Sequence, residues 1–168
     1  MSQKFTILFD LDGTLVDTAP DLMHAHNHIM KKYGYDERKL SDIKKLAGRG
    51  SKVMLTKSMH DIAELSGKIK KTDDVIEKMT KEFIDFYSKN IVKDSTLKNG
   101  VFDFLTWCKK NSILMGVCTN KQEHLSIDLL KKIKIHHFFD YVAGGNTFNH
   151  NKPDPKHLTD TIEIIVVT

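Results

Sequence analysis

The distribution of apolar residues predicts alternating strands and helices near both ends of the 168-residue chain. A short apolar run over 5–9 predicts a first strand, and similar runs over 113–119 and 141–143 predict two more. Helical spacing of apolar residues covers 101–110 and 123–133, next to these later strands. Strands that alternate with helices favour a parallel α/β sheet.

The middle of the chain carries helical patterns alone, with no β pattern from 19 to 90. Apolar residues recur at helical spacing over 19–33, 39–47 and 51–65, and a further helix is predicted to begin at 72–74. Glycines interrupt the pattern at 48 and 50. This all-helical stretch supports an insertion between the first strand and the rest of the sheet.

Length and composition fit an enzyme-like globular protein with one domain and a modest insertion. Apolar residues make up 40% and charged residues 29% of the sequence, which are ordinary proportions. The apolar run at the N-terminus is too short for a signal peptide or a membrane helix, so we expect a cytoplasmic protein without a membrane partner. Cys108 and Cys118 are expected to be buried and reduced.

The formal charge of +4 is distributed unevenly. Residues 19–98 hold 17 Lys and Arg against 12 Asp and Glu, whereas the remainder holds 9 against 10. A basic insertion beside an acidic core would attract small anions, although solvated helix faces explain the same lysines. The chain lacks an Arg-rich run and basic residues interleaved with aromatic ones, so we expect no nucleic-acid partner. We expect a monomer or a weak dimer.

Two carboxylates follow the first predicted strand in the sequence Asp10-Leu11-Asp12-Gly13-Thr14. The Gly-Thr pair indicates that the backbone turns there. Open α/β sheets place their chemistry where a strand ends at its carboxyl edge. A turn that uses Asp and Gly for backbone reasons would explain Gly13 and Asp12. It leaves unexplained why a buried strand ends in two acidic residues, with a third at Asp17.

The stretch from Phe9 to Thr18 resembles the first motif of the haloacid dehalogenase-like hydrolase superfamily, whose members are mostly phosphatases. Thr119, at the end of a predicted strand, matches the second motif. The sequence Lys152-Pro153-Asp154-Pro155 matches the third motif. The fourth, an acidic motif after one more strand, has no counterpart before Thr168, so the chain is expected to be truncated at its C-terminus relative to the family domain.

The resemblance implies a Rossmann-like parallel sheet core with an inserted all-helical cap. The core would comprise 1–17 and 99–168 and would lack its C-terminal strands, and the cap would comprise 18–98. Without the strand that leads to the fourth motif, the first strand would become an apolar edge of the sheet. The terminal residues 162–167 are β-prone, so they could pair with that edge or end a helix that starts near Pro155.

The resemblance also implies an aspartyl-phosphate mechanism. Asp10 would be the nucleophile, and Asp12 would protonate the leaving oxygen and then activate water. Thr119 and Asn120 would bind the phosphoryl group, with Asn120 and Lys121 at the start of the next helix. Lys152 would supply a cation beside Asp10 and the phosphate.

Family members use Mg²⁺, which prefers oxygen ligands in octahedral geometry. Asp10 and the main-chain carbonyl of Asp12 would supply two of those ligands here. A motif-four aspartate supplies another in the family. The nearest downstream candidates are Asp154 and Asp160, and neither is a convincing replacement.

Within the superfamily, the sequence looks most like phosphoglycolate phosphatases. The likeness rests on the first motif, on Gly48-Arg49-Gly50 in the cap and on Thr119-Asn120-Lys121. Arg49 would suit a substrate carboxylate, because a guanidinium can pair with it through two hydrogen bonds. An exposed arginine in a glycine-bounded helix break is the alternative. The resemblance implies a phosphatase of 2-phosphoglycolate; a sugar-phosphate phosphatase or phosphomutase and a catalytically inactive remnant are alternatives.

Overall fold

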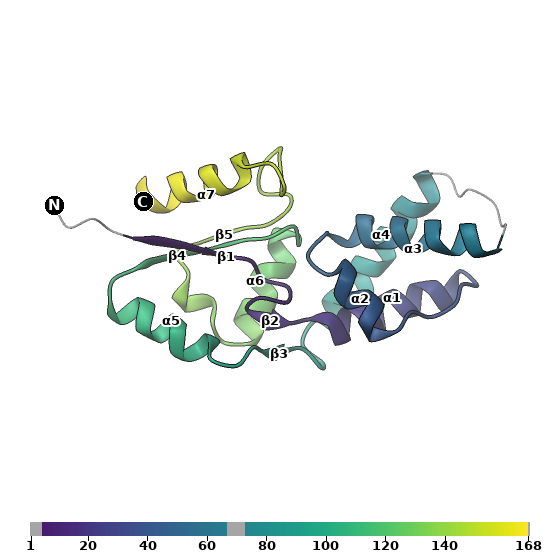
Figure 1. The fold of residues 1–168 in the computed structure, drawn as a ribbon, viewed down its shortest axis with the longest axis horizontal. Helices are drawn as coiled ribbons and strands as arrows, with labels where there is room; N and C mark the ends of the chain where they lie inside the picture. The colour runs from purple at the N-terminus through teal and green to yellow at the C-terminus, as the bar shows by residue number, and fades with distance from the viewer. Residues whose placement is uncertain (1–4, 67–72, 168) are drawn as a thin grey trace.

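The computed structural model describes residues 5–66 and 73–167. The described chain forms two lobes, one built around a sheet and the other from helices (Figure 1). The sheet lobe contains strands near both ends of the chain, and the helical lobe contains residues from between them.

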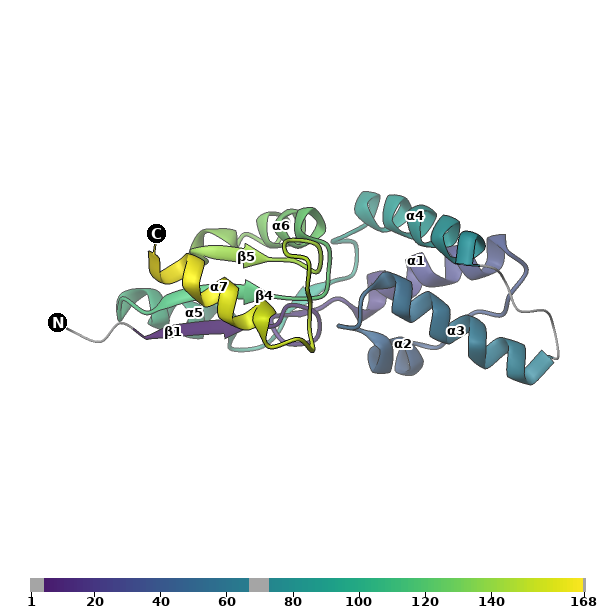
Figure 2. The same ribbon diagram turned by 90° about the horizontal axis from the view of Figure 1, so that it is seen from above.

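A parallel sheet forms the centre of the first lobe. Strands β1 (Thr6–Phe9), β4 (Leu114–Cys118) and β5 (Tyr141–Ala143) pair in the order β1-β4-β5. Helix α7 (Lys156–Val167) covers one face, and α5 (Val101–Lys110) and α6 (Glu123–Lys132) lie on the other side (Figures 1 and 2). The α/β fold class expected from the sequence is confirmed, with a Rossmann-like arrangement of sheet and helices.

Close packing of α7 on the sheet depends on the glycine in the middle of β4. A methyl group at Gly116 would collide with the side chains of Ile165 and Leu8. Because Gly116 leaves this space open, Ile165 packs into the core with 4% of its surface exposed. Residues 162–167 therefore belong to a helix and add no strand to the sheet.

Helices α1 (Ala19–Lys32), α2 (Leu40–Leu46), α3 (Ser51–Ser66) and α4 (Asp73–Lys89) form the second lobe. Helix α4 packs against α1 and α3, and its buried side chains come from Ile76, Met79, Phe83 and Tyr87. The helical patterns predicted in the sequence are confirmed in this lobe. The boundaries of core and cap at 17/18 and 98/99 stay a prediction.

The two chain crossings between the lobes run side by side. Strand β2 (Val16–Asp17) leads into α1 and pairs antiparallel with β3 (Thr96–Leu97), which leads back. The Lys98 amide also donates a hydrogen bond to the Leu15 carbonyl. This short pair was not predicted, because two residues are too few to give a strand pattern. It brings both crossings next to the turn that follows β1.

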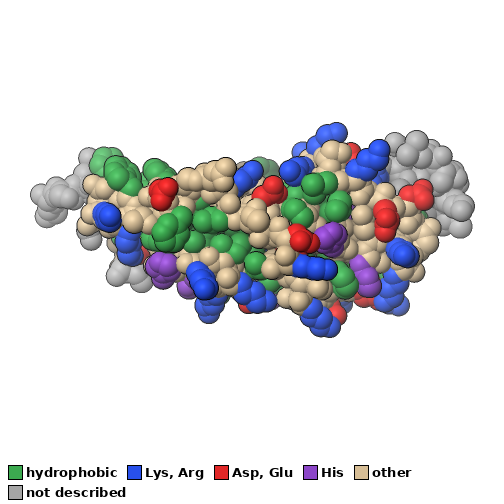
Figure 3. Space-filling model, turned by 90° about the horizontal axis from the view of Figure 1, so that it is seen from below, with side chains coloured by type: hydrophobic (Ala, Val, Ile, Leu, Met, Phe, Trp, Pro, Cys, Tyr) green, Lys and Arg blue, Asp and Glu red, His purple; other side chains and the backbone are tan. Residues whose placement is uncertain are grey.

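The sheet lobe leaves apolar surface uncovered in the described structure. Among the described residues β1 pairs with β4 alone, which confirms that the first strand lies at an edge. Figure 3 shows apolar side chains gathered on the underside of this lobe. Helix α5 exposes about half of the surface of each of three aromatic side chains, Phe102, Phe104 and Trp107.

Two further expectations can be compared with the structure. Cys108 and Cys118 are both buried and free, as expected. No helix within the described ranges has the length and apolar character needed to cross a membrane. A short 3-10 helix, His136–Phe138, completes the sheet lobe between α6 and β5.

Candidate active site

The turn after β1 carries both acidic residues of the first motif. Gly13 has a φ of +82°, a conformation that residues with a Cβ rarely adopt, and it allows the chain to reverse within three residues. The Val16 amide donates to the Leu11 carbonyl and the Gly13 amide donates to the Val16 carbonyl, which closes the turn. Asp10 and Asp12 therefore project from a fixed backbone at the carboxyl end of a parallel strand.

Asp10 forms an ion pair with Lys152, which lies 142 residues away along the chain. The distance from Lys152 Nζ to Asp10 Oδ1 is 2.8 Å. The same oxygen accepts a hydrogen bond from the Leu11 amide. Oδ2 of Asp10 makes no hydrogen bond to any described residue, and it faces Gly48, whose added Cβ would lie 3.8 Å from it. One Asp10 oxygen is thus anchored while the other faces the helical lobe.

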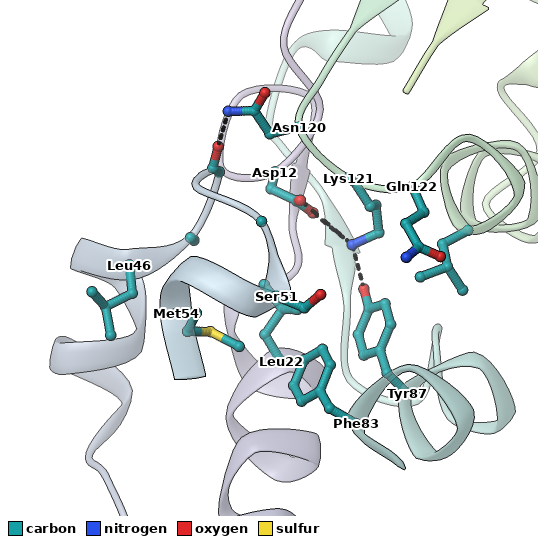
Figure 4. Close-up of a pocket in the computed structure, with 14 residues that line it drawn as sticks. Asp12, Leu22, Leu46, Ser51, Met54, Phe83, Tyr87, Asn120, Lys121 and Gln122 are labelled. Atoms are coloured by element: carbon teal, nitrogen blue, oxygen red, sulfur yellow. Dashed lines mark hydrogen bonds and ion pairs between the residues drawn. The ribbon is translucent and has the colours of Figure 1, made fainter. Parts of the chain in front are cut away.

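Asp12 pairs with Lys121, a residue that the sequence interpretation gave no individual role. Lys121 Nζ lies 3.0 Å from Asp12 Oδ1 and 3.4 Å from Oδ2. It also donates to the Tyr87 hydroxyl at 2.9 Å, so it links Asp12 to helix α4 (Figure 4). The Thr18 hydroxyl donates to Asp12 Oδ1 at 2.7 Å. Thr18 precedes α1 without capping it, because its side chain is committed to Asp12.

The charges around Asp12 are almost completely buried. The side chains of Lys121 and Asp12 are 5% and 6% exposed. Burial opposes the charge of Lys121, but Asp12 and Tyr87 outweigh this effect and raise the pKa of its ammonium group. Burial, together with the charge of Asp12, raises the pKa of Tyr87 to about 12 despite the opposing effect of Lys121. At neutral pH Lys121 is therefore a cation and Tyr87 keeps its proton.

Thr119 and Asn120 follow β4 and lie beside the turn that carries both aspartates. Thr119 is fully buried, and its hydroxyl accepts a hydrogen bond from the Lys121 amide. The Asn120 amide group donates to the carbonyls of Gly48 and Lys152, each at 3.2 Å. Its Oδ1 is buried and makes no hydrogen bond to a described residue. Asn120 and Lys121 precede α6, which begins at Glu123, so the expectation that they start this helix was wrong.

Two glycines after β5 allow the loop containing Asn120 to lie against the sheet edge. A Cβ at Gly144 would collide with the backbone of Glu123, and one at Gly145 would lie 2.5 Å from the Asn120 carbonyl oxygen. The Gly145 amide donates to the Lys121 carbonyl at 2.8 Å. This backbone contact fixes the loop from which Asn120 and Lys121 project.

A small cavity of about 40 Å³ lies between the two lobes, next to Asp12 (Figure 4). Its polar side chains come mainly from the sheet lobe, and its apolar wall comes mainly from the helical lobe. Lining residues from the sheet lobe are Asp12, Asn120, Lys121, Gln122 and Leu125. Lining residues from the helical lobe are Leu22, Leu46, Ala47, Gly48, Gly50, Ser51, Met54, Phe83 and Tyr87.

Arg49 is placed differently from its neighbours. Gly48 and Gly50 line the cavity, whereas the Arg49 side chain is exposed and does not belong to the lining. Positive φ angles of +81° at Gly48 and +86° at Gly50 turn the backbone on either side of it. Its role in substrate binding stays a prediction, and Lys121 is the cation that lines the cavity among the described residues.

Comparison with protein families gives a match over almost the whole chain. The family model described as haloacid dehalogenase-like hydrolase matches residues 7–167. The chain belongs to this family. A phosphoglycolate phosphatase from Mesorhizobium japonicum is 35% identical over 158 residues, which are 94% of this chain and 67% of the relative. One from Agrobacterium fabrum is 34% identical and covers 93% of this chain and 65% of its own length.

Solved structures of other proteins have the same fold. A predicted phosphoglycolate phosphatase from Haemophilus somnus 129pt superimposes with a TM-score of 0.87 at 25% identity, covering 96% of this chain and 71% of its own. A β-phosphoglucomutase from Clostridium difficile superimposes with a TM-score of 0.75 at 23% identity, covering 97% of this chain and 71% of its own. The chain spans 54–67% of the length of several phosphoglycolate phosphatases that it resembles.

The residues present can be compared with what a haloacid dehalogenase-like hydrolase needs for Mg²⁺. Asp10 Oδ2 is an anionic oxygen without a hydrogen bond to a described residue, which suits a hard cation. Asp154 Oδ1 accepts a hydrogen bond from the Lys156 amide, and the Asp160 carboxylate lies 2.9 Å from His150 Nε2. Both carboxylates already have partners, so neither is convincing in the role of the acidic residue in the family's fourth motif.

A second acidic group lies at the base of the helical lobe and consists of Asp21, His24 and Asp94. Asp21 is buried, and its carboxylate accepts hydrogen bonds from the amides of Lys93, Asp94 and Ser95 and from the Ser95 hydroxyl. These donors account for its burial, since a buried carboxylate needs such partners. Asp21 therefore anchors the segment that returns from the helical lobe to the sheet.

Sequence reasoning missed Lys121 and Tyr87 as members of the site. Lys121 adjoins the second motif, and a lysine next to a buried strand end was the available signal. Tyr87 lies on the buried face of α4 at helical spacing from Phe83, which is the pattern of a core residue. Only the packing of the two lobes brings its hydroxyl to Lys121.

Proposed function

We propose that the protein is a phosphatase that hydrolyses a small phosphorylated acid, with 2-phosphoglycolate as substrate. The contact that carries the proposal is the 2.8 Å ion pair between Lys152 and Asp10, on the same turn as Asp12. It unites the first and third family motifs at the end of β1, beside Thr119 of the second. Relatives named phosphoglycolate phosphatase support the choice of substrate.

In the proposed reaction, the Asp10 carboxylate attacks phosphorus and the ester oxygen leaves, which gives an aspartyl-phosphate. Asp12, in its protonated form, donates its proton to the leaving oxygen and later removes one from the water that hydrolyses the intermediate, which restores that form. Lys152 holds Asp10 through Oδ1 and offers positive charge to the phosphoryl oxygens. Thr119 and Asn120 place the adjoining loop against the same site.

Asp10 and the main-chain carbonyl of Asp12 would hold Mg²⁺ in this proposal. When bound, the ion supplies positive charge to the phosphoryl group during transfer. Family phosphatases generally use this ion, and the open Asp10 oxygen fits it.

The test is phosphate release from 2-phosphoglycolate by the chain 1–168, with and without Mg²⁺. We expect Mg²⁺-dependent release, and we expect Asp10→Asn to lower its rate by about 10⁴-fold or more, because loss of a nucleophile removes the covalent route. Asp103→Asn is the matched control, since Asp103 is an exposed carboxylate on α5 of the same lobe.

Three outcomes would contradict parts of the proposal. Isomerisation of a sugar phosphate without phosphate release would favour a phosphomutase. A folded chain that releases no phosphate would favour an inactive remnant. Equal activity in the Asp10→Asn variant would exclude Asp10 as nucleophile.

A further inference from the structure

The cavity between the lobes has one strongly polar corner, formed by Lys121 and Tyr87. Lys121 comes from the loop after β4 and Tyr87 from α4, so each lobe contributes one residue. The Lys121 side chain is 5% exposed and Tyr87 is 1% exposed. The Lys121 ammonium lies between Asp12 and the Tyr87 hydroxyl, with the apolar wall beyond it (Figure 4).

The hydrogen-bond donors of this corner are not all used. The Tyr87 hydroxyl accepts a bond from Lys121, and among the described residues it donates to none. Because the pKa of Tyr87 is raised to about 12, its proton stays in place at neutral pH. Lys121 Nζ lies 3.0 Å from one Asp12 oxygen and 3.4 Å from the other, and the hydrogen bond at 3.4 Å is weak. A buried donor without an acceptor is costly, so this corner is suited to a ligand that accepts hydrogen bonds.

We propose that Lys121 and Tyr87 form the subsite for a second anionic group of the substrate, a carboxylate next to the phosphate ester. The inference rests on the proposed phosphatase function and assigns the part of the site that selects its substrate. The Lys121 ammonium and the Tyr87 O–H would both donate to the carboxylate oxygens. Charge-assisted hydrogen bonds of this kind are stronger than neutral ones.

The position of Lys121 agrees with the dimensions of a short phosphorylated acid. In 2-phosphoglycolate one methylene group separates the ester oxygen from the carboxylate carbon. If Asp12 protonates the ester oxygen, the carboxylate must lie within a few ångströms of Asp12. Lys121 Nζ is 3.0 Å from Asp12 Oδ1, so it lies within reach of that carboxylate.

The remainder of the cavity restricts what can enter. Its volume of about 40 Å³ has room for a carboxylate-sized group. On one side Leu22, Met54 and Phe83 form an apolar wall, and this wall offers no hydrogen-bond partner to a ligand. Ser51, at the N-terminus of the 16-residue helix α3, also lines the cavity, and the positive end of this helix favours an anion.

Arg49 is the other cation that can be compared with Lys121 as a partner of the substrate carboxylate. It is the cation that the sequence suggested for the carboxylate, and it lies between two cavity-lining glycines with its own side chain exposed. If the carboxylate binds within the cavity, the charge of Arg49 is not needed for the preference for acids, whereas that of Lys121 is.

The test measures equilibrium binding to the full chain carrying Asp10→Asn, so that no turnover occurs, in the presence of Mg²⁺. Isothermal titration calorimetry compares 2-phosphoglycolate with ethyl phosphate, which has a methyl group in place of the carboxylate. Adding Lys121→Met should lower the preference for 2-phosphoglycolate by about 10-fold or more, and Tyr87→Phe should lower it by roughly 5- to 10-fold. Adding Arg49→Met should leave the preference unchanged.

Several results would overturn the assignment. One is an equal loss of affinity for 2-phosphoglycolate and for ethyl phosphate in Lys121→Met. That result would mean that Lys121 acts on Asp12 alone. Another is loss of the preference in Arg49→Met. Equal binding of both ligands by the parent protein would overturn the subsite but leave the phosphatase proposal intact, whereas binding of neither would contradict both.

A crystal structure of the Asp10→Asn protein with 2-phosphoglycolate gives an answer even if Lys121→Met fails to fold. We expect carboxylate oxygens within about 3.2 Å of both Lys121 Nζ and the Tyr87 hydroxyl, an ordinary hydrogen-bond distance. A carboxylate that lies against Arg49 or in open solvent would reject the subsite.

Discussion

The two aspartates of the turn after β1 are two residues apart, yet their surroundings differ. The pair Asp10–Lys152 lies within the sheet lobe and is partly open, with side chains 34% and 24% exposed. The pair Asp12–Lys121 is buried and extends through Tyr87 to the helical lobe. The open pair leaves one carboxylate oxygen accessible for chemistry. The buried pair joins the two lobes and is therefore expected to contribute more to stability.

The largest expected effect comes from removing one cation at a time. Lys121→Met leaves the buried Asp12 carboxylate without its charge partner and should lower the free energy of unfolding by about 3–5 kcal/mol. Lys152→Met breaks a partly exposed pair and should cost about 1 kcal/mol or less. Urea unfolding followed by circular dichroism measures both variants. Equal losses would mean that the two pairs do not differ in the way their burial suggests.

A smaller effect is expected from the hydroxyl that supports Asp12. Thr18 is fully buried and donates to Asp12 Oδ1 at 2.7 Å, so Thr18→Val should cost about 1–2 kcal/mol without changing side-chain shape. Thr14→Val, at an exposed position of the same turn, is the control and should change stability little. The same urea titrations would reject the assignment if both variants were equally stable.

The smallest expected effect is a pH dependence of the free energy of unfolding that arises near Asp10 and Lys152. His157, at the start of α7, is fully buried near Lys152, His150 and Asp160. Burial lowers the pKa of His157, with Lys152 adding to this effect, while the Gly144 backbone opposes it. Burial also lowers the pKa of His26 in α1. The unfolded chain therefore takes up protons at a higher pH than the folded one.

Stability from these histidines is complete above their ordinary pKa of 6.5 and is lost as the pH falls below it. His157→Gln should reduce the fall in the free energy of unfolding between pH 7.5 and 5.5. His124→Gln removes an exposed histidine of α6 and should leave the pH dependence as it is. A pH dependence that is the same in all three proteins would exclude a contribution from His157.

The sequence was sufficient for most of the fold, because long periodic segments specify their own structure. The helices at 101–110 and 19–32 and the strand at 141–143 lie where the apolar pattern placed them. The pattern could not decide the last segment, since β-branched residues at 162–167 suit a strand or a buried helix face. Ile165 settles it, because Gly116 opens a space in the sheet that this side chain fills from α7.

For the candidate site, too, some residues could be predicted from the sequence and others could not. Asp10, Asp12, Thr119 and Lys152 were predicted from the sequence alone, because each belongs to a short motif at the end of a strand or beside a turn. The structure places them at one end of the sheet, and their roles stay a prediction. These motifs also predicted the family that the comparison confirms. By itself the sequence thus determined the motifs, the family and the helices and strands, because each depends on residues that are close together in the chain.

Only the tertiary structure decided which residues of the helical lobe face the aspartates. Arg49 had the expected chemistry, but the glycines on either side turn the backbone so that its side chain is exposed. Tyr87 followed the pattern of a core residue, and the packing of α4 brings its hydroxyl to Lys121, 34 residues away in the sequence. The physical reason is that burial and ion pairing depend on how the two lobes pack, and local sequence does not encode this arrangement.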